Sequence, residues 1–163
     1  MQYTIEIYGL HLQDHSNGCK IVLTGTGSAL EKPRRKLYII HSGNDVLYVG
    51  EANTSLKLRF QRSCNSYNHF FLGGHAKNGY KGYKWLNAVN NKKRELTVTV
   101  AVFDERFDEN RTIVEAIEAE VVHLIRLKYA RWPEFQNEIH FSNCPGAGKI
   151  AEEIYRKMEF LQS

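Results

Sequence analysis

Two short apolar runs, each containing a tyrosine and separated by a polar turn, constrain most strongly what this chain can fold into. The runs cover residues 36–40 and 46–50, with a His-Ser-Gly-Asn-Asp turn between them. Alternating β-branched and aromatic residues around such a turn are typical of a β-hairpin. Because side chains alternate along a strand, Tyr38 and Tyr48 can lean towards the same end of the sheet, where Arg59 follows on the next element. The sequence therefore predicts a hairpin that brings two tyrosines and an arginine close together.

The whole chain, residues 1–163, predicts a single α/β domain. Further strands are expected at residues 2–10, 20–24, 96–103 and 138–141. Helices are expected to begin at Asn53 or Thr54, to cover 83–90, to run from Thr112 to about Arg131, and to include Ile150, Ile154, Met158 and Leu161. Thr112 and Glu115 have the spacing of a capping box. The expected architecture is a small mixed central β-sheet flanked by helices, with an added N-terminal hairpin at 1–35, a core at 36–141 and a C-terminal amphipathic helix at 142–163.

Basic residues are concentrated in one part of the chain. From Ala52 through Arg94 there is no Asp or Glu but there are nine Lys and Arg, although the whole chain has 22 basic and 18 acidic residues. Aromatic residues and histidines are interleaved with these cations, which is typical of a surface that binds a polyanion. The other interpretation of this window is a solvated basic face whose aromatic residues belong to the core.

Other sequence features exclude several classes of protein. The three cysteines are far apart and predict neither a disulfide framework nor a zinc site. No apolar run is long enough to span a bilayer, and the first residues form neither a basic start nor a cleavable apolar stretch. We therefore expect a cytoplasmic protein that does not contact a membrane.

Glu120 is the acidic residue with the most informative position on a predicted helix. At about 100° per residue it falls roughly 20° from Ile113 and about 40° from Leu124, with Leu127 on its other side. This places Glu120 inside the apolar face of the helix, whereas Glu118 lies at the margin of that face. A carboxylate directed towards a core needs a partner, because an unpaired buried charge is costly. Magnesium is one such partner, and a structural pair with an arginine or a tyrosine is the alternative.

The ordered set of these residues resembles the core of the GIY-YIG nuclease family. Tyr38 in Leu-Tyr-Ile-Ile matches the first tyrosine of the family, and Tyr48 in Tyr-Val-Gly matches the second. Arg59 matches the helix arginine and Glu120 the glutamate that binds the metal. Asn137, in Pro-Glu-Phe-Gln-Asn, is similar to the terminal asparagine. The resemblance covers about residues 36–141 and implies a GIY-YIG-like α/β sandwich.

The chain departs from the family pattern at two positions, and its segment between Glu120 and Asn137 is longer than usual. Lys36 stands where glycine is usual, and Ser63 stands where a histidine often follows the arginine by one helical turn. Any role of that histidine in proton relay would either pass to Arg62, His69 or His75 or be lost.

The resemblance implies a metal-dependent DNA endonuclease. Tyr38 would deprotonate water directly or through a neighbour, Arg59 would hold the phosphate, and Glu120 would position Mg²⁺ or Mn²⁺. Tyr48 and Asn137 would fix the geometry. The residues expected to dock the nucleic acid are Lys57, Arg62, His69, His75, Lys77, Lys81 and Lys84.

Two other functions are compatible with the same sequence. A nucleic-acid-binding module could keep the fold and the basic surface without cutting, and a protein-interaction domain would have no salt-dependent affinity for DNA. An enzyme that cuts palindromic sites would dimerise, so a homodimer is also an expectation.

Overall fold

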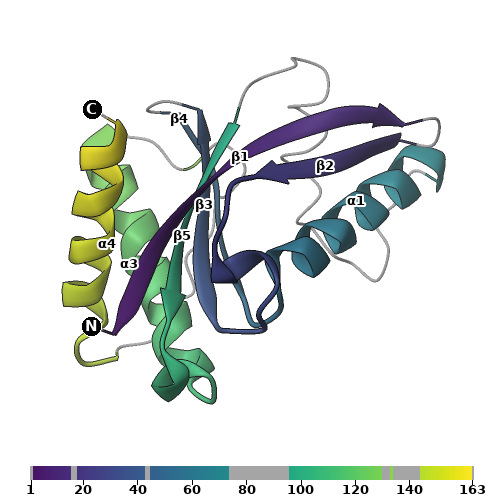
Figure 1. Cartoon of the computed structure of the whole chain (residues 1–163). Helices are drawn as coiled ribbons and strands as arrows, with labels where there is room; N and C mark the ends of the chain where they lie inside the picture. Colours follow the sequence, from purple (N-terminus) through teal and green to yellow (C-terminus); the bar gives the residue numbers. More distant parts are fainter. Residues whose placement is uncertain are drawn as a thin grey trace.

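A five-stranded β-sheet with helices on both faces forms the centre of the molecule (Figure 1). The computed structural model describes residues 2–15, 18–42, 45–73, 96–129, 133 and 144–162. The strands are β1 (Tyr3–His15), β2 (Gly18–Thr24), β3 (Lys36–Ser42), β4 (Asp45–Ala52) and β5 (Leu96–Phe103). The helices are α1 (Leu56–Gly73), α3 (Arg111–Tyr129) and α4 (Ala147–Gln162), with the 3-10 helices η1 (Ser28–Leu30) and η3 (Glu105–Phe107). The helix predicted over 83–90 and the strand predicted over 138–141 lie outside the described residues.

The described strands follow the order β2-β1-β5-β3-β4, and each neighbouring pair is antiparallel. β1 connects the N-terminal hairpin with the central strands, because residues 3–10 pair with β5 and residues 9–15 pair with β2. β5 has partners on both sides, as its apolar sequence predicts. The predicted α/β fold, with a central sheet flanked by helices and an N-terminal hairpin, is confirmed, but the described strand pairs are all antiparallel where a mixed sheet was expected. The hairpin continues into the central sheet through β1.

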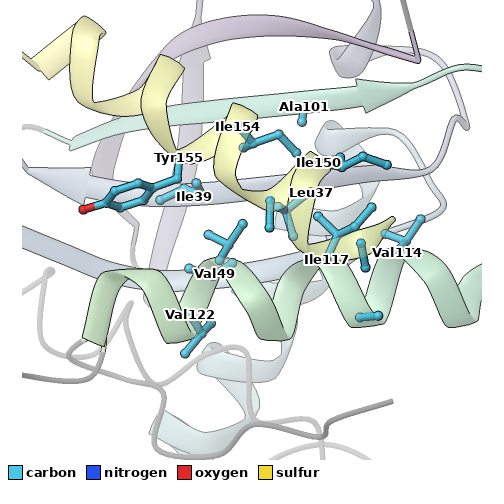
Figure 2. Packing of buried hydrophobic residues seen from close by; sticks show 14 of the residues in the cluster. Leu37, Ile39, Val49, Ala101, Val114, Ile117, Val122, Ile150, Ile154 and Tyr155 are labelled. Atoms are coloured by element: carbon cyan, nitrogen blue, oxygen red, sulfur yellow. The ribbon is translucent and has the colours of Figure 1, made fainter. Parts of the chain in front are cut away.

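The alternation of side chains along β3 divides the interior into two apolar clusters on opposite faces of the sheet. Leu37 and Ile39 pack with α3 and α4, whereas Tyr38 and Ile40 pack with α1. Figure 2 shows the first of these clusters, between the sheet and the two helices. Tyr38 therefore faces α1, the helix that carries Arg59.

The helices differ in the parts of the sheet that they cover. α1 lies along the β1–β2 hairpin and packs against β2 and η1, whereas α3 packs against α4 and against β4 (Figure 1). β4 is the last strand in the described order, so α3 lies close to an edge of the described sheet. None of the helices in the described ranges is both long and apolar enough to cross a membrane.

The two longer helices start at residues other than the predicted caps. Ser55, not Asn53 or Thr54, caps α1, because its Oγ accepts a hydrogen bond from the Leu58 amide at 3.2 Å. Asn110 caps α3 in the same way, since its side-chain oxygen accepts from the Ile113 amide at 3.3 Å. In both helices the side-chain oxygen meets the amide three residues later, as an N-cap requires.

Glu6 on β1 holds η1 against the sheet. Its carboxylate accepts hydrogen bonds from the Tyr8 hydroxyl at 2.6 Å and from the backbone amides of Ser28 and Ala29, each at 2.9 Å. Burial alone would raise the pKa of Glu6, but these hydrogen bonds together outweigh it and hold the pKa below its ordinary 4.5. A carboxylate therefore fixes the loop that supports one side of α1.

Candidate active site

Tyr38 and Arg59 meet on the α1 face of the sheet. Arg59 Nε donates a hydrogen bond to the Tyr38 hydroxyl at 3.2 Å. Tyr38 comes from β3 and is 1% exposed, whereas Arg59 comes from the first turns of α1 and is partly exposed. The predicted proximity of these two residues is thus present in the structure.

The rings around Tyr38 hold its phenol in one place. The Tyr48 ring lies 6.1 Å from the Tyr38 ring between centroids, and the Phe60 ring packs against Tyr38 edge-on at 5.5 Å. Tyr48 is partly exposed, so the second predicted tyrosine lies at the boundary between the apolar cluster and solvent. An aromatic wall and a cation therefore meet at the Tyr38 hydroxyl.

The packing around Gly50 explains why a glycine follows the second tyrosine in the Tyr-Val-Gly motif. Gly50 pairs with Tyr38 across the β3–β4 ladder. A Cβ at this position would lie 2.4 Å from both Cζ and Oη of Tyr38 and 2.8 Å from Cε1 of Tyr48. Only a residue without a side chain leaves room for the two phenol rings.

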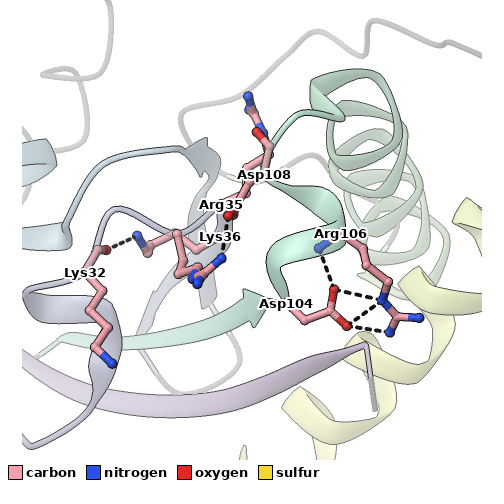
Figure 3. Close-up of polar contacts among 7 residues, drawn as sticks. Lys32, Arg35, Lys36, Asp104, Arg106 and Asp108 are labelled. Atoms are coloured by element: carbon pink, nitrogen blue, oxygen red, sulfur yellow. Dashed lines mark hydrogen bonds and ion pairs between the residues drawn. The ribbon is translucent and has the colours of Figure 1, made fainter.

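Lys36 is fully buried at the start of β3. Its Nζ donates hydrogen bonds to the backbone carbonyls of Lys32 at 3.0 Å and Thr54 at 2.5 Å; Figure 3 shows the contact with Lys32. Burial lowers the pKa of Lys36 from 10.5 to about 8, against the opposing effects of Glu6 and Asp108. The sequence predicts no role for Lys36, although its place at the head of an apolar strand is a signal of burial.

The cations that precede β3 are paired with acids. Arg34 forms an ion pair with Asp108, and Arg35 forms one with Glu51. The Nε of Arg35 also donates to the Asp108 carbonyl at 3.2 Å, as Figure 3 shows. These arginines therefore connect the loop before β3 to the segment before α3 and to β4.

The predicted position of Glu120 inside the buried face of its helix is wrong. Leu127, which shares its side of α3, is 67% exposed, and Ile113 and Leu124 are only partly buried. Glu118 lies on the more deeply buried side. The residues three, four or seven positions from it on that side are Val114, Val121, Val122 and Ile125, each at most 2% exposed.

The prediction for Glu120 was wrong because it counted every apolar residue of the helix as equally buried. The buried side of α3 is centred near Val121 and Ile125, since this side faces both the sheet and α4. The apolar residues next to Glu120 are at the border of that contact. Both Glu118 and Glu120 remain partly exposed.

The glutamates of α3 and the tyrosine–arginine pair belong to elements that pack on opposite faces of the described sheet. Tyr38 faces α1, whereas α3 covers the other face of the sheet and lies along β4. Among the described residues, no three His, Cys, Asp or Glu side chains gather into a group that could hold a metal. Magnesium often takes only one or two protein carboxylates, so a site with a single glutamate of α3 would not form such a group.

The predicted nucleic-acid-binding residues are only partly described. Lys57 is exposed and forms an ion pair with Glu31, and Arg62 is exposed on α1. Ser63 is 1% exposed, and its Oγ donates to the Arg59 carbonyl at 3.3 Å. The remaining predicted residues lie outside the described residues or, for His69, have side chains that are not described: His69, His75, Lys77, Lys81, Lys84 and Asn137.

Comparisons with known proteins give one structural similarity. No family model and no curated protein matches the chain. Among solved structures, the restriction endonuclease HPY188I in complex with product DNA is similar, with a TM-score of 0.49 and 13% sequence identity, over 79% of this chain and 78% of that one. A likeness of this degree assigns neither a family nor an activity, so the function is argued below from the residues themselves.

Proposed function

We propose that this protein is a metal-dependent endonuclease that hydrolyses phosphodiester bonds in DNA. The hydrogen bond from Arg59 to the Tyr38 hydroxyl is the observation that supports this most directly. The resemblance to the GIY-YIG nucleases requires these two residues to meet, although they are separated by the whole of β4. The space that Gly50 leaves for the Tyr38 ring is a second, independent feature of the same arrangement.

The pair can perform two of the steps that hydrolysis of a phosphodiester needs. A guanidinium stays charged and grips phosphate oxygens, so Arg59 would hold the scissile phosphate next to Tyr38. The same guanidinium would stabilise the phenolate form of Tyr38, which would take a proton from the attacking water and become the neutral phenol. Tyr48, at the solvent boundary, would orient the approaching phosphate.

A glutamate of α3 would hold the Mg²⁺ or Mn²⁺ ion, and the candidates are Glu118 and Glu120. When bound, the ion would stabilise charge on the leaving oxygen. The burial pattern of α3 favours Glu118, and the sequence resemblance favours Glu120. Asn137 and the basic residues of the Ala52–Arg94 window would complete the DNA contacts.

Cleavage of supercoiled plasmid DNA tests the proposal. The wild-type protein should nick or linearise the plasmid with Mg²⁺ or Mn²⁺ and should lose this activity in excess chelator. Arg59→Ala should lower the rate at least about 100-fold, as loss of a charge-stabilising group does elsewhere. Arg156→Ala is the matched control, because Arg156 is an exposed arginine on α4 whose ion pair is with Glu152, one helical turn away. Equal rates for the two variants would exclude the proposed role of Arg59.

A nucleic-acid-binding module that does not cut is the second candidate. The 1% exposure of Tyr38 favours it, because water reaches the phenol only if a neighbouring side chain moves. This candidate predicts salt-dependent DNA binding without cleavage by any divalent metal. Binding and cleavage should therefore be measured on the same protein samples.

A further inference from the structure

Lys36 lies on the same strand and the same face as Tyr38, two residues earlier. It is fully buried, and both of its hydrogen bonds go to backbone carbonyls, those of Lys32 and Thr54. A buried ammonium that binds main-chain oxygens fixes the path of the backbone. The two carbonyls belong to the loop before β3 and to the connection between β4 and α1.

The Thr54 carbonyl is next to the first turn of α1. Thr54 precedes Ser55, whose Oγ accepts from the Leu58 amide at 3.2 Å and whose carbonyl accepts from the Arg59 amide at 3.0 Å. The ammonium of Lys36 is therefore connected through one residue to the turn that carries Arg59. A shift of the Thr54 carbonyl would move this turn as a unit.

The same turn is attached to β3 at a second point. The Nε of Arg59 reaches back to the Tyr38 hydroxyl, two residues along the strand from Lys36. We propose that Lys36 is a positioning residue: it anchors the start of α1 to β3 and thereby places Arg59 on Tyr38. The effect of Lys36 on catalysis rests on the proposed nuclease function, whereas its anchoring of α1 to β3 does not.

The electrostatic surroundings explain why a lysine can occupy this site. Glu6 on β1 and Asp108 before α3 are the acids whose charges favour the ammonium, and burial opposes them. With a pKa of about 8, Lys36 is mostly protonated at pH 7. The charged form, with its stronger hydrogen bonds, is therefore the one that holds the two carbonyls.

Lys36→Met tests the proposal because methionine has a similar length and no donor. Two readouts are needed: exchange of the Leu58 and Arg59 amides measured without DNA, and steady-state cleavage of plasmid DNA. The two amides should exchange about tenfold faster, as expected when buried carbonyls lose their donors. kcat should fall on the order of 10–100-fold with little change in KM, because Arg59 is displaced while DNA binding is kept.

The controls separate failure of this inference from failure of the nuclease assignment. Lys20→Met, on an exposed position of β2, should match the wild type in both readouts. Lys36→Gln keeps amide donors on a shorter side chain, so smaller losses are expected, and it provides the test if the methionine variant does not fold. Wild-type amide exchange in a folded Lys36 variant would overturn the anchoring role, whatever the activity. Faster exchange in a protein that shows no cleavage would leave the anchor in place and contradict only the nuclease function.

Discussion

The arrangement of the two tyrosines can be tested by adding a single methyl group at Gly50. Its φ is not in the left-handed region, so Gly50→Ala is compatible with the backbone, and the contacts decide the outcome. The new Cβ would overlap the Tyr38 ring, which would have to move away from Arg59. We expect destabilisation of about 1–3 kcal/mol, typical of overpacking. Cleavage should fall on the order of 100-fold, typical of a displaced reacting group.

Gly148→Ala is the matched control for this change. Gly148 is exposed on α4, and a Cβ there meets no atom within 4 Å. It should be neutral or stabilise the protein by up to about 1 kcal/mol, because alanine is the better helix former. Thermal unfolding and plasmid cleavage measure both variants. If Gly50→Ala behaved like Gly148→Ala, the packing of Tyr38 over Gly50 would have no functional role.

The two glutamates of α3 can be distinguished by parallel substitution. If the deeply buried side of α3 supplies the metal ligand, Glu118→Gln should weaken Mg²⁺-dependent cleavage at least about tenfold, as loss of a metal-site contact does. Glu120→Gln should then stay close to the wild type. The measurement is the Mg²⁺ concentration that gives half-maximal cleavage. The opposite result would restore the assignment that the sequence resemblance makes to Glu120.

These residues show what the sequence could and could not predict. Tyr38 and Arg59 were found because strand alternation and a short connection to a helix are local properties. The burial of Glu118 and Glu120 depends on how α3 is rotated against the sheet and α4, which no local pattern encodes. The role of Lys36 depends on carbonyls of two separate loops, so only the folded structure reveals it.

At the level of elements, the attachment of η1 to β1 depends on one carboxylate. Glu6→Gln replaces an acceptor of several hydrogen bonds with an amide whose NH₂ group faces backbone donors. We expect a loss of about 1–2 kcal/mol in the free energy of unfolding at pH 7, within the range for hydrogen bonds to a partly exposed charged group. Urea unfolding measures this loss. Glu105→Gln, at an exposed residue of η3, should change stability by less than about 0.5 kcal/mol.

The pH dependence of this difference has a defined sign. Because the pKa of Glu6 is lower in the folded state than its ordinary 4.5, its contribution is fully present above that value. The contribution is lost as the pH falls through the lower folded pKa. The difference between wild type and Glu6→Gln should therefore shrink in acid, and a difference that grew on acidification would contradict the hydrogen-bonding scheme.

The starts of the helices show a similar limit of prediction. The starts of α1 and α3 were predicted to within a few residues, since their apolar spacing is clear. The sequence could not choose among neighbouring cap residues: Asn53, Thr54 and Ser55 all have suitable side chains, and the structure uses Ser55. Cap identity follows from the direction in which the chain leaves β4, which is a tertiary property.

At the scale of the whole molecule, the two apolar faces of the sheet follow from the alternation that the sequence displays, whereas the strand order is known only from the structure. What the sequence could not give is the placement of α3 beside β4 and of α1 along the β1–β2 hairpin. These placements decide which charged residues share a surface. They also explain why Arg34, which is close to the basic window in sequence, is paired with Asp108 of the segment before α3.

Lys36 should affect the stability of the whole molecule in a pH-dependent way. Its pKa is about 8 in the folded state and 10.5 ordinarily, so between these values the folded protein has released a proton that the unfolded chain still holds. Unfolding then takes up a proton, and the free energy of unfolding must rise with pH across this window.

The stability of the wild type relative to Lys36→Met should therefore increase by about 2–3 kcal/mol between pH 7 and pH 10, the energy that corresponds to this displacement of the pKa. Taking the difference between the two proteins removes the effects of other groups that titrate in the same range, such as exposed tyrosines. Urea unfolding at several pH values measures it, with Lys20→Met expected to give no such trend. A flat difference would mean that the ammonium of Lys36 is solvated in the folded protein, and the anchor between β3 and α1 would then lose its physical basis.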